Sequence, residues 1–78
     1  MPVFHYTLDN EAQETQEHRR TANQILDKGG IDPTDHYLVE LKGSTRESFQ
    51  GKGETEIQMH EHMRFVSVFT GPTPVSAP

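Results

Sequence analysis

The chain has 78 residues, with seven Lys or Arg against twelve Asp or Glu, which gives a formal net charge of −5. A chain of this length forms one small domain, and without Cys it has no disulfide, no thiolate metal ligand and no cysteine nucleophile. The acidic balance argues against nucleic acid as a partner, because phosphate binding needs a basic face. We find neither a secretion signal nor the roughly 20 apolar residues that a membrane span requires, and we therefore expect a cytoplasmic protein that does not bind membranes.

The first third of the chain predicts a strand, a turn and a polar edge segment. Val3 to Leu8 alternates between an apolar face and a polar face, as a half-buried strand does. Asp9-Asn10-Glu11 supplies turn residues. The segment from Glu14 to Arg20 has no large apolar side chain at either parity, so if it forms a strand, we expect that strand at the edge of a sheet.

A short helix is predicted next. Thr21-Ala22-Asn23-Gln24 fits a capping box, so the helix should start at Ala22. Gly29-Gly30 after Lys28 supplies the left-handed stop and a cation in the last turn. A helix of two turns is unstable alone in water, and it therefore has to dock on a sheet through Ile25 and Leu26.

The second half of the chain predicts further strands. Pro33 lies in a turn that leads into a strand from Tyr37 to Lys42, in which Tyr37, Val39 and Leu41 share one face. A short strand is expected from Glu47 to Gln50 around Phe49. Arg64 to Thr70 gives the strongest strand signal in the chain, with apolar residues at both parities, as in a central strand.

The order of these elements is typical of one fold class. Strand, strand, helix, strand, short strand, compact turn and final strand is the order of the β-grasp fold, an α+β architecture with one short helix across a mixed sheet of four to five strands. We expect its first and last strands to be parallel neighbours at the centre of the sheet. The domain should cover residues 1–71, and residues 72–78, which include three Pro, should form an extended tail.

None of the motifs with catalytic or metal-binding potential is complete. His60-Glu61-His62 offers two imidazoles for a metal, but a third ligand is not evident and the spacing is not that of a zinc protease. Gly51-Lys52-Gly53 departs from the phosphate-binding loop, and no Ser lies in a nucleophile elbow. We therefore expect no enzyme, no cofactor and no metal.

A partner surface is predicted on the sheet. If Phe65 and Phe69 face the helix together with Tyr37 and Val39, an apolar patch is left on the far face of the sheet. The opposite parity, with Phe65 and Phe69 outside, stays open. The predicted protein-binding patch consists of Leu38, Val66 and Val68.

The sequence resembles ubiquitin-like proteins and, more closely, the bacterial multi-ubiquitin domain family, over nearly the whole chain. The similar segments are Phe4-His5-Tyr6-Thr7-Leu8-Asp9-Asn10-Glu11, Thr21-Ala22-Asn23-Gln24-Ile25-Leu26, Gly30-Ile31-Asp32-Pro33, His36-Tyr37-Leu38-Val39-Glu40, Phe65-Val66-Ser67-Val68 and Thr70-Gly71-Pro72-Thr73-Pro74-Val75. The resemblance implies a protein modifier, whose partners would be ubiquitin-activating-like and conjugating-like proteins and a metal-dependent isopeptidase-like protein. These partners would supply the chemistry, acting on the C-terminal carboxylate of the modifier.

The chain departs from the modifier pattern at its end. It closes with Ser76-Ala77-Pro78 instead of the glycines that a narrow activation tunnel admits, which makes Gly71 the candidate processing or conjugation point. The Pro-rich end could instead be a linker of the kind that joins domains in longer relatives. We therefore expect a non-enzymatic ubiquitin-like modifier or modifier precursor, with a stand-alone interaction adaptor that is never conjugated as the alternative.

Overall fold

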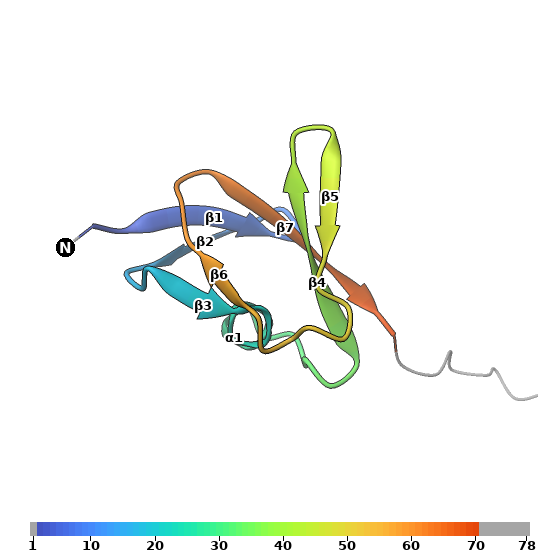
Figure 1. Ribbon diagram of the computed structural model, residues 1–78. Coiled ribbons are helices and arrows are strands. Elements are labelled where there is room, and N and C mark those ends of the chain that lie inside the picture. Colours follow the sequence, from blue (N-terminus) through green and yellow to red (C-terminus); the bar gives the residue numbers. More distant parts are fainter. Residues whose placement is uncertain (1, 71–78) are drawn as a thin grey trace, which may run out of the picture.

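The computed structural model describes residues 2–70, which form a mixed five-stranded sheet, a two-stranded sheet and one helix (Figure 1). The strands of the large sheet lie in the order β2-β1-β7-β4-β5, and β3 pairs with β6. The elements are β1 (Phe4–Leu8), β2 (Glu11–Thr15), β3 (Arg19–Thr21), α1 (Ala22–Lys28), β4 (His36–Lys42), β5 (Thr45–Ser48), β6 (Glu56–Gln58) and β7 (Met63–Phe69).

The topology is that of an α+β, β-grasp-like fold, as the sequence predicts. β1 and β7 are parallel neighbours, with Tyr6 opposite Met63 and Leu8 opposite Phe65, and the other strand pairs are antiparallel. β7 therefore lies at the centre of the sheet, between β1 and β4. The predicted tail and Gly71 lie outside the described residues.

The first hairpin places the polar segment that follows β1 at the edge of the large sheet. Asp9 and Asn10 have φ angles of 53° and 68°. They are the two left-handed residues of a type I′ turn. The following strand, β2, lies at the edge of the sheet. The predicted strand from Glu14 to Arg20 is interrupted, because the chain leaves the large sheet after Thr15 and pairs again as β3 with β6.

The helix begins and ends as its caps predict. The Thr21 side chain accepts a hydrogen bond from the Gln24 amide at 3.1 Å, and the Gln24 side chain accepts one from the Thr21 amide at 2.9 Å. At the other end, the Ile31 amide donates to the Leu26 carbonyl at 2.9 Å and the Gly30 amide donates to the Asp27 carbonyl at 3.0 Å, a Schellman motif with Gly30 at φ 78°. These bonds satisfy backbone groups at both ends of this short helix.

The core lies between α1 and the sheet. Ile25 and Leu26 are 0% and 1% exposed and dock on the sheet, as a helix of this length requires. The other buried hydrophobic residues of the core cluster are Tyr6, Leu8, Ala22, Leu38, Phe49, Ile57, Met59, Met63 and Phe65. The rings of Tyr6 and Phe65 meet edge to face, with centroids 5.7 Å apart. Among the described residues no helix is long and apolar enough to cross a membrane.

Candidate functional site: the open face of the sheet

The face of the sheet that points away from α1 carries two of the three residues in the predicted patch. Phe65 is buried in the core, so its strand neighbours Val66 and, two residues on, Val68 point to the opposite face, where they are half-buried. The first of the two parities considered for β7 is therefore correct. Phe69 shares the parity of Phe65 but is 51% exposed, because it lies at the end of β7.

Leu38 does not lie on this face, and its assignment to the patch is wrong. Its side chain is completely buried in the core cluster under the helix. β4 lies between β7 and β5, so apolar residues occur at both of its parities and their pattern does not mark the outer face. Tyr37 and Val39, which we expected to face the helix, take the outer positions instead, because they alternate with Leu38.

The corrected patch is formed by cross-strand neighbours on β4 and β7. Tyr37 lies opposite Val68 and Val39 lies opposite Val66, and the side chains of directly opposite residues lie on the same face of a sheet. Val39 is 7% exposed although it is outside the core cluster, so its neighbours on the open face shield it. We call Tyr37, Val39, Leu41, Val66 and Val68 the open-face patch.

Arginine side chains flank the open-face patch at one end. Leu41 lies opposite Arg46 of β5 on one side and opposite Arg64 of β7 on the other. Both arginines are exposed, and neither forms an ion pair with another residue between positions 2 and 70. The patch thus combines an apolar centre with a basic edge on a protein whose net charge is −5.

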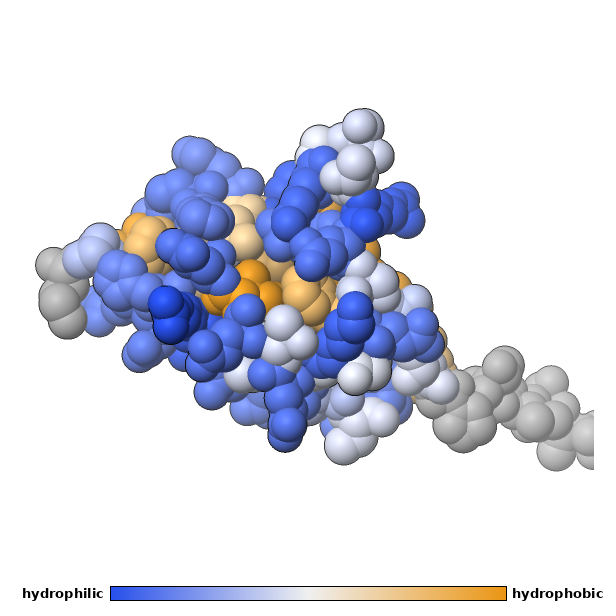
Figure 2. All heavy atoms as spheres, in the orientation of Figure 1, coloured by the Kyte–Doolittle hydropathy of each residue, from blue (hydrophilic) through white to orange (hydrophobic). Residues whose placement is uncertain are grey.

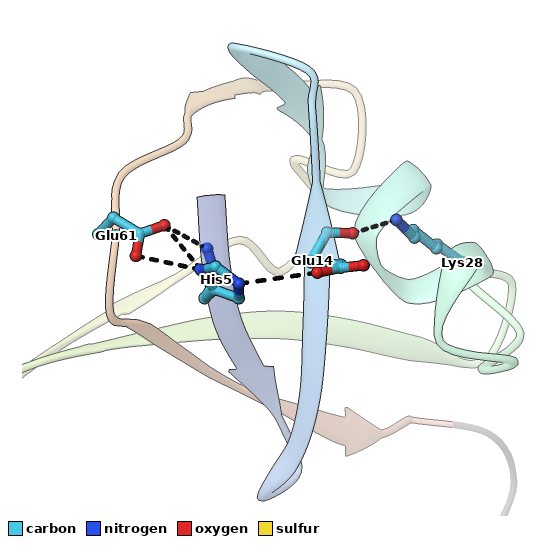
Figure 3. Close-up of polar contacts among 4 residues, drawn as sticks. All are labelled: His5, Glu14, Lys28 and Glu61. Carbon is cyan, nitrogen blue, oxygen red and sulfur yellow. Dashed lines mark hydrogen bonds and ion pairs between the residues drawn. The ribbon is translucent and has the colours of Figure 1, made fainter. Parts of the chain in front are cut away.

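A polar cluster is centred on His5 of β1, with Glu61 on one side of it and Glu14 and Lys28 on the other (Figure 3). The His5 amide donates to the Glu61 carboxylate at 2.6 Å, and the ring nitrogen Nδ1 lies 3.2 Å from both of its oxygens. The hydrogen bond from the His5 amide, followed by that from the ring, lowers the pKa of Glu61. Nε2 lies 3.7 Å from the Glu14 carboxylate, and Lys28 of α1 donates to the Glu14 backbone carbonyl. The cluster therefore connects β1 to β2 and to the segment between β6 and β7.

The histidine motif is not assembled into a metal site. Glu61 binds His5, while the His60 amide donates to the Met63 sulfur at 3.1 Å and His62 adopts a left-handed φ of 64°. Across residues 2–70 no three His, Asp or Glu side chains are placed to hold a metal ion together. His60 and His62 instead lie in the segment between β6 and β7, which leads into β7.

Sequence reasoning missed three members of the open-face patch. Tyr37, Val39 and Leu41 form a regular apolar alternation, and such alternation ordinarily marks the buried face of a strand. Glu40 and Lys42 share the parity of Leu38, and charged residues at that parity favour an outward Leu38, yet Leu38 and Glu40 are both buried on the inner side. The chain matches no protein-family model, and neither a curated protein nor a solved structure is significantly similar to it.

Proposed function

We propose that this chain is a non-enzymatic, ubiquitin-like β-grasp protein that binds other proteins through the open-face patch. Its role is that of a modifier or modifier precursor in a bacterial conjugation-like pathway of the cytoplasm. The observation that carries the proposal is the row of cross-strand apolar pairs, Tyr37 with Val68 and Val39 with Val66, on the face of the sheet opposite α1.

The composition of this face favours a protein partner. Aromatic and Arg side chains are enriched in protein interfaces, and a tyrosine and two arginines lie in and beside this small patch. A partner with an apolar centre and an acidic rim would complement Leu41 between Arg46 and Arg64. The ion pairs would speed the encounter, and burial of the valines would hold the complex.

The resemblance to modifiers suggests which partners to test. A ubiquitin-activating-like protein would adenylate the C-terminal carboxylate, a conjugating-like protein would receive the modifier, and a metal-dependent isopeptidase-like protein would process it. In this scheme the chain itself contributes the binding surface and the processing point, for which Gly71 is the candidate.

Val66→Asp tests the surface with the activating-like protein as the binding partner. We expect binding to weaken by at least about tenfold while the circular dichroism spectrum stays native, because the new charge would lose water in the interface without gaining a partner. Gln16→Asp, on an exposed loop, introduces the same charge far from the patch and should bind like the wild type. Equal binding by both variants would remove the open-face patch from the interface.

A second experiment separates a modifier from its precursor. The full chain and a chain ending at Gly71 are incubated with the activating-like protein and ATP, and pyrophosphate release is measured. Release with the truncated chain alone identifies a precursor that must be cut at Gly71. Release with the full chain identifies a modifier that is activated as it stands.

The adaptor is retained as the alternative function because of β5. It is an edge strand with all four residues exposed, and an edge strand can pair with an extended segment of a partner. If neither the full chain nor the chain ending at Gly71 releases pyrophosphate, while binding to the activating-like protein is retained, the adaptor function would be favoured.

A further inference from the structure

A second surface feature lies on the helix side of the sheet, behind the open-face patch. A groove of about 470 Å³ runs between the β4–β5 hairpin and β6. Figure 2 shows it as a hydrophobic hollow surrounded by hydrophilic atoms, with the hairpin on one side. Its lining includes Glu40, Lys42, Glu47, Phe49, Glu56 and Ile57.

Glu40 is the unusual residue of this groove. It is 8% exposed, and its strand parity directs the side chain to the same side of the sheet as the buried Leu38. Within residues 2–70 its carboxylate accepts no hydrogen bond, and its nearest cation, the Lys42 Nζ, lies 3.9 Å away. Buried carboxylates are normally paired and hydrogen-bonded, whereas Glu40 has only this long ion pair with Lys42. Burial accordingly raises the pKa of Glu40.

The groove has a surplus of negative charge around an apolar floor. Glu40, Glu47 and Glu56 contribute three carboxylates and Lys42 one ammonium group, so the formal charge is −3 + 1 = −2 with His60 neutral. Lys42 is engaged elsewhere, because it donates to Glu47 at 2.6 Å. Phe49, Ile57 and Met63 form the floor, and all three belong to the buried core cluster.

We propose that this groove binds an arginine side chain carried by an extended segment of a partner protein. The guanidinium would donate to Glu40, and the aliphatic stem would lie on Phe49 and Ile57. Arginine suits the site better than lysine does, because its planar group binds a carboxylate in bidentate fashion, stacks on aromatic faces and loses less hydration on burial. The site is separate from the open-face patch, and the inference does not depend on the proposed function.

The test uses nuclear magnetic resonance with two matched peptides. The probe is acetyl-Ala-Ala-Arg-Ala-Ala-amide, and the control peptide carries citrulline, the neutral isostere, in place of arginine. We expect the arginine peptide to bind with a Kd on the order of 1 mM and to shift the backbone amides of Glu47, Ile57 and His60 and the carboxyl carbon of Glu40. The citrulline peptide should bind at least about tenfold more weakly, because it lacks the charge.

Two protein variants complete the test. Glu40→Gln should reduce the affinity for the arginine peptide by at least about tenfold. Glu11→Gln is the matched control, since Glu11 shares the register row and the inner face of Glu40 but lies exposed on the edge strand β2. It should bind like the wild type.

Several results would overturn the proposal. Equal binding of the arginine and citrulline peptides would show that no charge is recognised, and unchanged binding by Glu40→Gln would exclude the buried carboxylate. Peptide-induced shifts confined to Val66, Val68 and their neighbours would place the site on the open face. A concentration-dependent dimer in sedimentation, lost in Glu40→Gln, would replace the partner segment by a second copy of this chain.

Discussion

Asp9 completes the hydrogen bonding of β7 at the point where its parallel neighbour β1 has ended. The Ser67 amide donates to Asp9 Oδ1 at 2.8 Å, and the Ser67 hydroxyl donates to Oδ2 at 2.5 Å. One step earlier along the same ladder, the Asp9 amide donates to the Phe65 carbonyl at 3.0 Å. A carboxylate in the hairpin turn therefore takes the place of the next acceptor on β1, and it connects the first turn of the chain to the last strand.

Removing this carboxylate should weaken the fold. Asp9→Ala loses two hydrogen bonds to a charged acceptor and places Ala at a φ of 53°, so we expect a loss of about 1–3 kcal/mol in the free energy of unfolding. Asp9→Asn keeps one acceptor and the tolerance for the left-handed conformation, and it should lose less than half as much. Urea titration measures both variants. An Asp9→Ala midpoint equal to that of the wild type would mean that water replaces the carboxylate at no cost.

The two faces of β4 and β7 can be distinguished by a matched pair of truncations. Leu38→Ala empties a fully buried position and should cost about 2–5 kcal/mol. Val68→Ala removes half-buried methyl groups from the open face and should cost less than about 1 kcal/mol. Denaturant titration of the two variants gives the comparison, and a larger loss for Val68→Ala than for Leu38→Ala would reverse the assignment of the faces.

The capping box gives a prediction for the helix. Thr21→Ala removes the acceptor of the Gln24 amide, and a lost N-cap typically costs about 1 kcal/mol. Thr21→Ser keeps that acceptor and should fall within about 0.5 kcal/mol of the wild type. The free energy of unfolding checks both. If the two variants were equally destabilised, the methyl group of Thr21, and not its hydroxyl, would be the stabilising part.

The elements that were correctly predicted are those whose determinants are local in sequence. The capping residues Thr21 and Gln24, the glycines after Lys28 and the turn at Asp9-Asn10 act on their immediate neighbours, and each lies where its local chemistry indicates. The pairing of β1 with β7 was also predicted, because few sheet topologies accommodate this order of elements. Local turns and caps together with the element order were therefore enough for the helix and the central strand pair, whereas the two-stranded sheet of β3 and β6 was not predicted.

The faces of β4 could not be predicted because they depend on the tertiary environment. Leu38 and Glu40 share a parity, so a pattern of apolar and charged residues favours the wrong side. The helix covers Leu38, whereas Glu40 lies farther along the strand and opens into the groove beside β6. Which of the two residues is covered depends on how far α1 extends along the sheet. The residues of β4 do not determine that extent.

Acid should weaken the contact between Glu61 and His5. The hydrogen bonds from His5 lower the pKa of Glu61 below its ordinary value of 4.5, so the ionised form is favoured in the folded chain. Its contribution to stability is present above pH 4.5 and is lost as the pH falls through the lowered pKa. Glu61→Gln should therefore be less stable than the wild type at pH 7, and the difference should shrink as the pH falls below 4.5.

The control for this pH dependence is Glu54→Gln. Glu54 is exposed and takes part in no ion pair or side-chain hydrogen bond with residues 2–70. The stability of this variant should follow that of the wild type across the same pH range in thermal melts. A Glu61→Gln curve that runs parallel to both would show that the hydrogen bonds from His5 do not discriminate between the charged and the neutral carboxyl group.

Glu40 should have the opposite dependence on pH. Burial, and to a smaller extent the neighbouring Glu47, raises the pKa of Glu40 above 4.5, whereas Lys42 and His60 oppose the shift. The neutral carboxyl group is thus favoured in the folded chain, and its contribution to stability, present below pH 4.5, is lost as the pH rises through the raised pKa. Glu40→Gln should be more stable than the wild type at pH 7, because it removes a buried charge. Thermal melts should show this advantage disappearing as the pH falls below 4.5, whereas a variant less stable than the wild type at pH 7 would mean that the attraction of Lys42 at 3.9 Å outweighs the cost of burial.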